Sequence, residues 1–222
     1  MKYIKMITTL LLLAGAVSLI SGSGKAESHD FESNEMGEFF IGETETAVFA
    51  GGCFWGVEGV FERLEGVEDV VSGYSGGSAE TARYNLVGSG KTRHAEAVRI
   101  VYDPSQISYE KLLEIFFLVA HNPTELNYQG PDVGTEYRSA VFYIDETQKM
   151  KTEKYIKELE MKKRYSKPIV TQLEKLDAFY PAEAYHQNFM KLNPNHPYIV
   201  YWDIPKVRDL EERYPELLSQ MK

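Results

Sequence analysis

The pattern of apolar and polar positions predicts a series of short strands and helices that begins at residue 46. Strand-like stretches, in which apolar side chains alternate or cluster, cover 46–50, 67–74, 95–102, 138–144 and 168–176. Apolar residues three or four apart predict helices from Phe54 until Gly66, over 109–120 and over 145–165, and a short helix over 185–192. The order is strand, helix, strand, strand, helix, strand, helix, strand.

This order predicts an α+β fold, with helices packed on a mixed, mostly antiparallel sheet, as a ferredoxin-like α/β sandwich or roll. Ser108 is a candidate cap for the second helix, and Asp145 with Gln148 forms a possible capping pattern for the third. We expect a catalytic domain over 46–205, preceded by a flexible, acidic leader over 27–45 and followed by a charged tail over 206–222.

Residues 1–26 have the pattern of a secretory signal peptide. Lys2 and Lys5 precede an apolar stretch over 6–20, and Gly24-Lys25-Ala26 offers small residues for cleavage. The stretch is shorter than the roughly 20 apolar residues that span a bilayer, although an uncleaved anchor is the alternative. We expect an exported protein, periplasmic or secreted, with no stable membrane association after the signal is removed.

Composition narrows the class of protein. The chain has 222 residues, of which 43% are hydrophobic, and this suits one globular domain. Its formal net charge is −9 without basic runs, which argues against nucleic acid as a partner. Fifteen tyrosines and eleven phenylalanines are too many aromatic residues for a disordered chain. We expect a monomer.

The chain contains one cysteine, Cys53. Exported proteins usually pair their cysteines, so a lone thiol is either buried and inert or present for its reactivity. Cys53 follows Gly51-Gly52 where a strand turns into a helix, and a helix N-terminus favours a thiolate and lowers the thiol pKa. Phe54 and Trp55 belong to the core, or form an aromatic wall that holds a thioether methyl group.

Five segments, in order, resemble the A-type peptide methionine sulfoxide reductases. The first is Gly-Gly-Cys53-Phe-Trp-Gly, which resembles the active-site signature of that family. The other segments are Gly73-Tyr-Ser-Gly-Gly77, His94-Ala-Glu-Ala-Val98, Asn127-Tyr-Gln-Gly-Pro-Asp-Val-Gly-Thr-Glu-Tyr-Arg-Ser139 and Ala184-Tyr-His-Gln187. The matches run from about residue 48 to residue 201 and so cover the whole expected domain.

The resemblance implies a catalytic role for four residues. Cys53 would attack the sulfoxide sulfur and become a sulfenic acid, while Glu96 would donate a proton to the sulfoxide oxygen. Tyr74 and Tyr137 would hydrogen-bond that oxygen. Burial would raise the pKa of Glu96 and keep it protonated, and its position on the same strand face as Val98 fits a buried side.

The resemblance also implies the substrate site and the partners. Phe54 and Trp55 would hold the methyl group, and Asp132 would bind the peptide part of the substrate. Oxidised proteins or free methionine sulfoxide would be substrates, with the S epimer preferred. No cofactor and no metal site are expected, since one cysteine and five scattered histidines show no zinc-type spacing.

The residues alone leave plainer alternatives open. Glu96 would otherwise be a surface carboxylate on an edge strand, and Tyr74 and Tyr137 would be core tyrosines. His94 and His186 are given no catalytic role.

Three departures from the family pattern stand out. Asn122 replaces a frequent aspartate, and Arg93 stands where glycine is frequent. The third is the missing second cysteine, which in many members resolves the sulfenic acid. Regeneration must therefore use an external thiol through a mixed disulfide, with a thioredoxin-like or glutaredoxin-like protein as the expected partner.

Two other functions compete with this interpretation. A cysteine hydrolase would pair Cys53 with His186, oriented by Asn193 or Asn195, but the local signature of papain-like enzymes is absent. A non-enzymatic module that binds oxidised proteins, or a thiol sensor, would bind the sulfoxide without releasing methionine.

Overall fold

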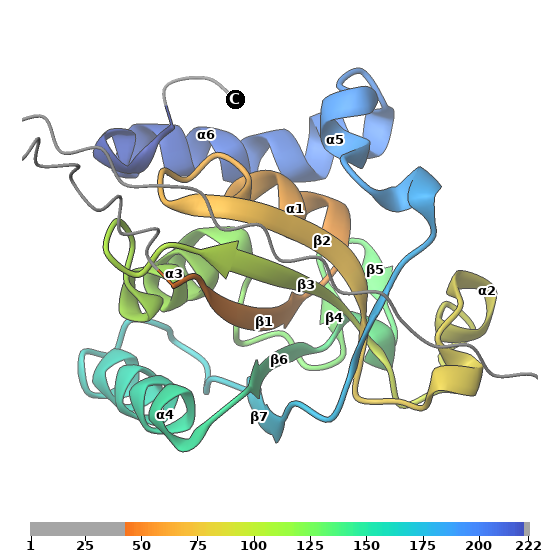
Figure 1. The fold of residues 1–222 in the computed structure, drawn as a ribbon, viewed down its shortest axis with the longest axis horizontal. Helices are drawn as coiled ribbons and strands as arrows, with labels where there is room; N and C mark the ends of the chain where they lie inside the picture. The colour runs from red at the N-terminus through yellow and green to blue at the C-terminus, as the bar shows by residue number, and fades with distance from the viewer. Residues whose placement is uncertain (1–42, 220–222) are drawn as a thin grey trace, which may run out of the picture. The chain divides into compact units, whose positions relative to one another are not determined.

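A six-stranded sheet forms the centre of the protein (Figure 1). The structure is a computed structural model and describes residues 43–219. Neighbouring strands are antiparallel except the last two at one edge, β6 and β7, which are parallel. The strands in spatial order are β7 (Gln172–Lys175), β6 (Ser139–Tyr143), β1 (Glu45–Gly51), β3 (Ala95–Tyr102), β2 (Val67–Ser75) and β8 (Phe179–Pro181).

The central four strands and two helices form a β-α-β-β-α-β unit. Helix α1 (Phe54–Phe61) connects β1 to β2, and α3 (Tyr109–Ile115), extended by a π-helix over Phe116–Ala120, connects β3 to β6. In space these four strands run fourth, first, third, second, which is the ferredoxin-like arrangement. The predicted α+β class with a mixed, mostly antiparallel sheet is confirmed.

The two faces of the sheet are packed differently, as strand alternation requires. Val98, Ile100 and Tyr102 of β3 join the main core with α1 and α3, whereas Ala95 and Ala97 join a smaller cluster on the opposite face. This alternation places Glu96 on the side of the sheet that α1 covers, as expected from the sequence.

Helix α4 (Glu146–Met161) begins at the predicted cap. The Asp145 side chain accepts a hydrogen bond from the Gln148 amide at 2.8 Å. Gln148 itself reaches two neighbouring segments, accepting from the Ile144 amide and donating to the Thr46 carbonyl, so it ties the helix to the sheet. Ser108 caps α3 by accepting from the Lys111 amide.

The segment expected to be a charged tail is a helix instead. A π-helix over Ile199–Asp203 continues as α6 (Ile204–Arg213), which packs against α1 and buries Val207 and Leu210. The apolar residues of α6 recur at helical spacing, but the many charged residues between them hide this pattern in the sequence. The signal peptide expected over 1–26 and the leader up to residue 42 lie outside the described residues.

The remaining elements have fewer than five residues each, and all of them except those between residues 184 and 192 left no pattern in the sequence. The expected strand over 168–176 is shortened to β7, and the helix expected over 185–192 is a 3-10 turn followed by α5. The short elements are α2 (Tyr84–Val87), α5 (Phe189–Leu192), β4 (Tyr128–Gln129), β5 (Asp132–Val133), β8 and the 3-10 turns Ala79–Thr81, Thr135–Tyr137, Ala184–His186 and Pro215–Leu217.

Between residues 43 and 219, none of the helices combines the length and the apolar character needed to span a bilayer.

The packing predicts a large effect for a substitution in β1. Phe49 is fully buried and stacks on Phe116 with ring centroids 4.8 Å apart, so Phe49→Ala leaves a cavity between sheet and helix. We expect it to lower the free energy of unfolding by about 3–5 kcal/mol in urea titrations. Met150→Ala, at an exposed position of α4, is the control and should change it by less than about 0.5 kcal/mol. Equal effects of the two substitutions would contradict this packing.

Candidate functional site

Cys53 lies between the end of β1 and the first residue of α1, at the N-cap position, and only 8% of its surface is exposed. The preceding Gly52 has φ +89°, and a Cβ atom there would lie 2.6 Å from Cβ of Gln129. Gln129 is fixed in turn by hydrogen bonds of its amide group to the backbone of Asn122. Glycine is therefore needed at position 52 to let the thiol segment pass over the Gln129 side chain.

Burial governs the charge state of Cys53. It raises the pKa of the thiol well above its ordinary value, and the nearby Glu96 and Asp203 raise it further. The Trp55 amide and Lys206 lower this pKa but do not outweigh burial. The thiolate predicted from the helix N-terminus is therefore wrong for the resting site, because desolvation outweighs the hydrogen bond from the Trp55 amide at the helix start.

Glu96 is held directly beside the catalytic turn. It lies on β3 opposite Tyr74 of β2, is 2% exposed, and its Oε2 accepts a hydrogen bond from the Phe54 amide at 3.1 Å. Burial raises the pKa of Glu96 to about 8, with Asp132 and Glu136 adding to the rise and the Phe54 amide opposing it. The carboxyl group is therefore mostly protonated at neutral pH and available as an acid.

Tyr74 and Tyr137, the two tyrosines predicted from the sequence, differ in what their hydroxyl groups contact. Tyr137, in the 3-10 turn before β6, has its pKa raised by burial and by Glu96, Asp132, Tyr84 and Cys53, so its phenol belongs to the group around the thiol. Tyr74 is fully buried, and its hydroxyl donates to Oε2 of Glu183 at 2.9 Å. The Tyr74 hydroxyl is thus already engaged.

Tyr84 is the site residue that sequence reasoning missed. It begins α2, its amide donates to Oε1 of Glu183 at 3.0 Å, and its ring centroid lies 4.4 Å from that of His186. Burial raises the pKa of its hydroxyl, with Glu96 and Cys53 as the next causes, and the residue remains 36% exposed. The segment around Tyr84 has no periodicity, and its contacts to Glu183 and His186 come from far along the chain.

Phe54 and Trp55 form part of an aromatic cluster next to Cys53, in which Phe54 is a core residue and Trp55 is half-buried. The Trp55 ring stacks on Phe189 with centroids 3.7 Å apart, and its Nε1 donates to Nδ1 of His186 at 3.2 Å. The Phe54 ring is buried 5.0 Å from the ring of His186 and 6.0 Å from that of Tyr74. His186 therefore holds this cluster in place, and its Nδ1 is occupied by tryptophan, which does not favour a cysteine hydrolase.

Asp132 lies on β5, at the turn of the small β4–β5 hairpin. Its Oδ2 accepts a hydrogen bond from the Tyr198 hydroxyl, and burial raises the pKa of its carboxyl group. Because Asp132 contributes to the raised pKa values of Glu96, Tyr84 and Tyr137, it belongs to the same cluster.

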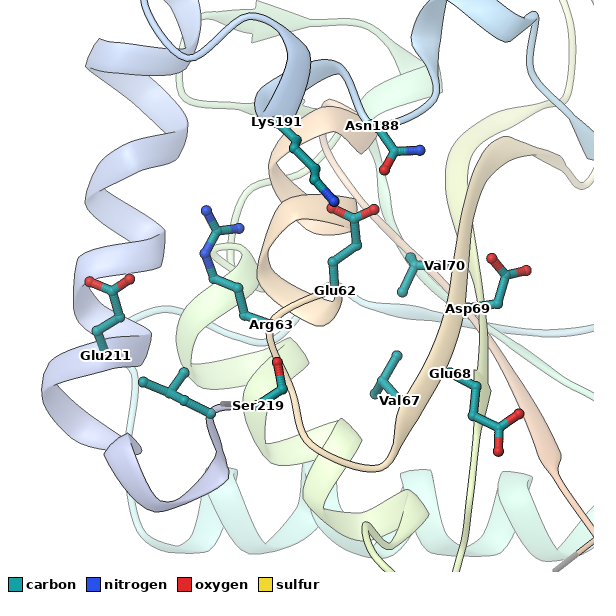
Figure 2. A pocket seen from close by; sticks show the side chains of 11 residues that line it. Glu62, Arg63, Val67, Glu68, Asp69, Val70, Asn188, Lys191, Glu211 and Ser219 are labelled. Atoms are coloured by element: carbon teal, nitrogen blue, oxygen red, sulfur yellow. The ribbon is translucent and has the colours of Figure 1, made fainter. Parts of the chain in front are cut away.

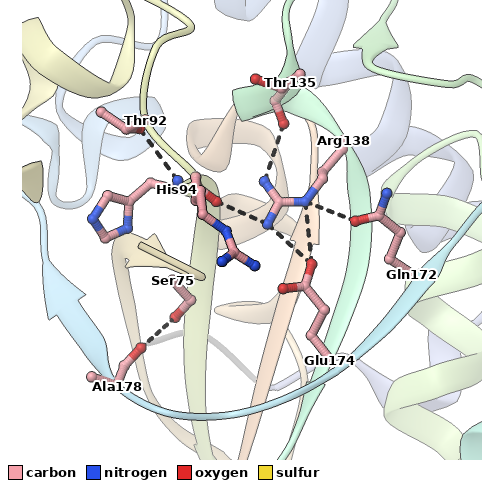
Figure 3. Close-up of polar contacts among 9 residues, drawn as sticks. Ser75, Thr92, His94, Thr135, Arg138, Gln172, Glu174 and Ala178 are labelled. Carbon is pink, nitrogen blue, oxygen red and sulfur yellow. Dashed lines mark hydrogen bonds and ion pairs between the residues drawn. The ribbon is translucent and has the colours of Figure 1, made fainter. Parts of the chain in front are cut away.

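Arg138 joins the segments that carry Glu96 and Tyr137 (Figure 3). Its guanidinium group donates to the Thr135 and Arg93 carbonyl oxygens at 3.2 and 3.1 Å, and to the side chains of Gln172 and Glu174 on β7. The bond to Arg93 uses the carbonyl oxygen of the backbone. It therefore does not depend on the side chain at position 93, where the family often has glycine.

Asn122, the other departure, keeps the function of an aspartate in its turn. Its Oδ1 accepts from the amide and the hydroxyl of Thr124 at 3.1 and 2.8 Å. The loop geometry therefore needs a carbonyl-type oxygen there, which asparagine supplies.

A separate pocket of about 480 Å³ lies at the far end of α1, beyond Glu62 and Arg63, and includes Asn188 and Lys191 (Figure 2). None of the predicted site residues lines it. In the described range, no three His, Cys, Asp or Glu side chains are grouped closely enough to hold a metal ion.

Comparison with known proteins decides the family. The family model "Peptide methionine sulfoxide reductase" matches residues 45–217. The chain belongs to the peptide methionine sulfoxide reductase family. It is 55% identical to the reductase MsrA 2 of Mesorhizobium japonicum over 80% of this chain and 91% of that protein. It is 51% identical to MsrA 2 of Synechocystis sp. over 79% and 82% of the two chains.

Solved structures of the family have the same fold. The reduced form of Mxr1 from Saccharomyces cerevisiae aligns with a TM-score of 0.64 and 32% identity, covering 69% of this chain and 88% of that one. Methionine sulfoxide reductase A of Corynebacterium diphtheriae aligns with a TM-score of 0.61 and 32% identity, covering 69% and 76%. Membership confirms the predicted activity, reduction of methionine sulfoxide, and the enzyme class, peptide-methionine (S)-S-oxide reductase. The residue roles stay predictions.

The site predicts different effects for its tyrosines. We expect Tyr84→Phe to lower kcat about 10- to 100-fold, because it removes a hydroxyl of the cluster around the thiol that we expect to bind the reacting oxygen. Tyr74→Phe should lower kcat less than Tyr84→Phe and should lower the melting temperature, since it breaks a part-buried hydrogen bond to Glu183. Steady-state kinetics with methionine sulfoxide and thermal unfolding measure both. A larger loss of kcat in Tyr74→Phe would restore Tyr74 as the residue that binds the oxygen.

Proposed function

We propose that the protein reduces methionine sulfoxide through a Cys53 sulfenic acid, with Glu96 as proton donor and an external thiol as reductant. The observation that carries this mechanism is the hydrogen bond between Glu96 and the Phe54 amide. It places a carboxyl group that is protonated at neutral pH against the residue that follows Cys53.

The first half of the reaction transfers oxygen from one sulfur to another. Cys53 Sγ forms a bond to the sulfoxide sulfur as Glu96 gives its proton to the sulfoxide oxygen, which otherwise is a poor leaving group. The thiol proton passes to the Glu96 carboxylate and restores it. The protonated oxygen then migrates from the substrate sulfur to Sγ as the new S–S bond breaks, and methionine leaves with the electron pair of that bond. Cys53 is now a sulfenic acid, and two electrons have passed from cysteine to the substrate.

The surrounding side chains have distinct roles in this step. The hydroxyls of Tyr84 and Tyr137 hold the sulfoxide oxygen, and Tyr74 supports Tyr84 because both contact Glu183. The sulfoxide methyl group lies against the rings of Phe54 and Trp55. Asp132 receives the peptide part of an oxidised protein, and free methionine sulfoxide uses the same site.

Regeneration follows from the cysteine count. The sequence contains one cysteine, so the sulfenic acid reacts with the thiol of a reductant, releasing water and forming a mixed disulfide. A second thiol then attacks this disulfide, which returns Cys53 to the thiol and leaves the reductant oxidised. A thioredoxin-like or glutaredoxin-like protein with two cysteines fits both steps. The yeast relative Mxr1 has been seen in complex with Trx2.

We also propose export of the chain by its N-terminal segment, on the basis of the basic and apolar pattern in residues 1–26. An exported reductase would repair oxidised proteins outside the cytoplasm. Mass spectrometry of the mature protein from a cell fraction would show whether these residues are removed, and an intact cytoplasmic chain would contradict export.

The proposal as a whole is tested by a steady-state assay with each sulfoxide epimer and several thiol donors. We expect turnover with the S epimer and a donor that has two thiols. Binding of the sulfoxide without release of methionine would indicate a sensor or binding module instead.

The pKa of Glu96 predicts the pH dependence of the rate. The protonated carboxyl group is the active form and its pKa is about 8, so kcat should fall as pH rises above that value. Glu96→Gln should lower kcat about 10²- to 10⁴-fold, because the amide does not release a proton. Glu68→Gln, at an exposed position on β2, is the matched control. A wild-type rate that continues to rise well above this pH would exclude Glu96 as the acid.

The single cysteine predicts one turnover in the absence of thiol. Without a reductant, each chain should release no more than about one methionine, because the sulfenic acid has no internal partner. Adding a thioredoxin-like protein should restore turnover and form a mixed disulfide that is visible as a gel shift. Cys53→Ser is the control and should release none. Several turnovers without added thiol, or a stable intramolecular product, would contradict the scheme.

A further inference from the structure

An ion pair between a buried aspartate and a half-buried lysine of the C-terminal helical segment is not used by the mechanism above. Asp203 precedes α6 and is fully buried, and its Oδ1 lies 3.2 Å from Nζ of Lys206 in the first turn of α6. The other oxygen, Oδ2, is buried and has no hydrogen-bond partner in the described part of the chain. Burying the Asp203 carboxylate carries a desolvation cost that the ion pair offsets only in part, so its presence calls for another explanation.

The pair lies against the first turn of the catalytic helix. A Cβ atom at Gly56, three residues after Cys53, would lie 2.1 Å from Oδ1 of Asp203 and 2.8 Å from Nζ of Lys206. A glycine at this position is what allows both charged groups to approach the turn that begins at Cys53. The two charges act on the thiol with opposite sign, since Asp203 raises its pKa and Lys206 lowers it.

The other titratable groups that face Cys53 are largely uncharged at neutral pH. Tyr84, Tyr137 and Tyr198 have pKa values raised mainly by burial and partly by the thiol, and the pKa of Glu96 is about 8. Asp132 lies further along the same cluster, where Lys206 also acts on it. Asp203 and Lys206 are therefore the ion pair nearest the turn at Cys53; burial raises the pKa of Asp203, and Lys206 opposes that rise.

We infer that Lys206 is a positioning residue that stabilises Cys53 as a thiolate, and that Asp203 holds the lysine in place and limits its effect. The inference adds to the proposed function and rests on it, because the thiolate matters only if Cys53 is the nucleophile of that reaction. Two steps pass through a thiolate: the attack on the sulfoxide, and the release of Cys53 from the mixed disulfide. In the second, the reductant's sulfurs bond to each other, and the electron pair of the broken S–S bond goes to Cys53.

The decisive experiment measures the alkylation of Cys53 by iodoacetamide as a function of pH, with the full chain and detection by mass spectrometry. Because the chain has one cysteine, every alkylated molecule reports on Cys53. Lys206→Met should lower the rate about threefold to tenfold near pH 7.5, since the thiolate is the reacting form. Lys206→Arg should retain most of the rate. Arg208→Met, an exposed position on the same helix, should retain all of it.

Asp203→Asn provides a test of opposite sign. Removing the carboxylate should shift the alkylation profile to lower pH and raise the rate, whereas Lys206→Met shifts it to higher pH. A purely structural pair would move both profiles in the same direction through partial unfolding, which thermal melts of each variant would reveal. Three outcomes would overturn the inference. They are shifts of both profiles in one direction, an unchanged profile for Lys206→Met, and a Lys206→Arg variant that loses as much rate as Lys206→Met.

The assay separates this inference from the proposed function because it contains no sulfoxide. If Lys206→Met fails to fold, the sign of the Asp203→Asn shift still decides, and an unchanged or lowered rate would overturn the inference. A folded wild-type protein with the expected alkylation shifts but no reductase activity would contradict the function alone.

Discussion

The hydrogen bond from the Phe54 amide to Glu96 is the contact on which the site depends. It joins the first turn of α1 to the start of β3, so the thiol and the acid are held by different elements and fixed relative to each other. A solvated glutamate would be ionised at neutral pH and would not protonate the substrate. Here burial keeps the proton on the carboxyl group, and the single backbone donor orients it without reversing that effect.

Close approach of backbones and side chains makes this geometry possible. Gly52 allows the chain to pass over Gln129, and Gly56 allows the Asp203–Lys206 pair to reach the helix. Arg138 links the turn that carries Tyr137 to the entry of β3 and to the edge strand β7. Gln129 and Arg138 thus fix the loops around the thiol without taking part in the chemistry.

The sequence revealed the fold wherever burial leaves a periodic pattern. The alternation in 95–102 placed Glu96 on the buried face correctly, and the helical spacing after Cys53 placed the thiol at a helix start. It did not reveal Tyr84, whose position depends on Glu183, or α6, whose apolar positions are hidden among charges. The charge state of Cys53 was also misjudged, because a helix N-terminus is visible in the sequence and desolvation is not. The contact of Tyr84 with Glu183 and the burial of Cys53 both depend on segments far apart in the chain, so neither leaves a local pattern in the sequence.

Burial of the resting thiol has a consequence for an enzyme that works among oxidants. Peroxides and disulfides react with thiolates, and the further oxidation of a sulfenic acid to sulfinic and sulfonic acids is damaging because it is hard to reverse. A cysteine that stays protonated and 8% exposed is a poor target for such reagents. It becomes a nucleophile when a substrate fills the site and takes the proton of Glu96. The burial that makes the resting thiol unreactive therefore also protects the catalytic cysteine of an enzyme that repairs oxidised methionine.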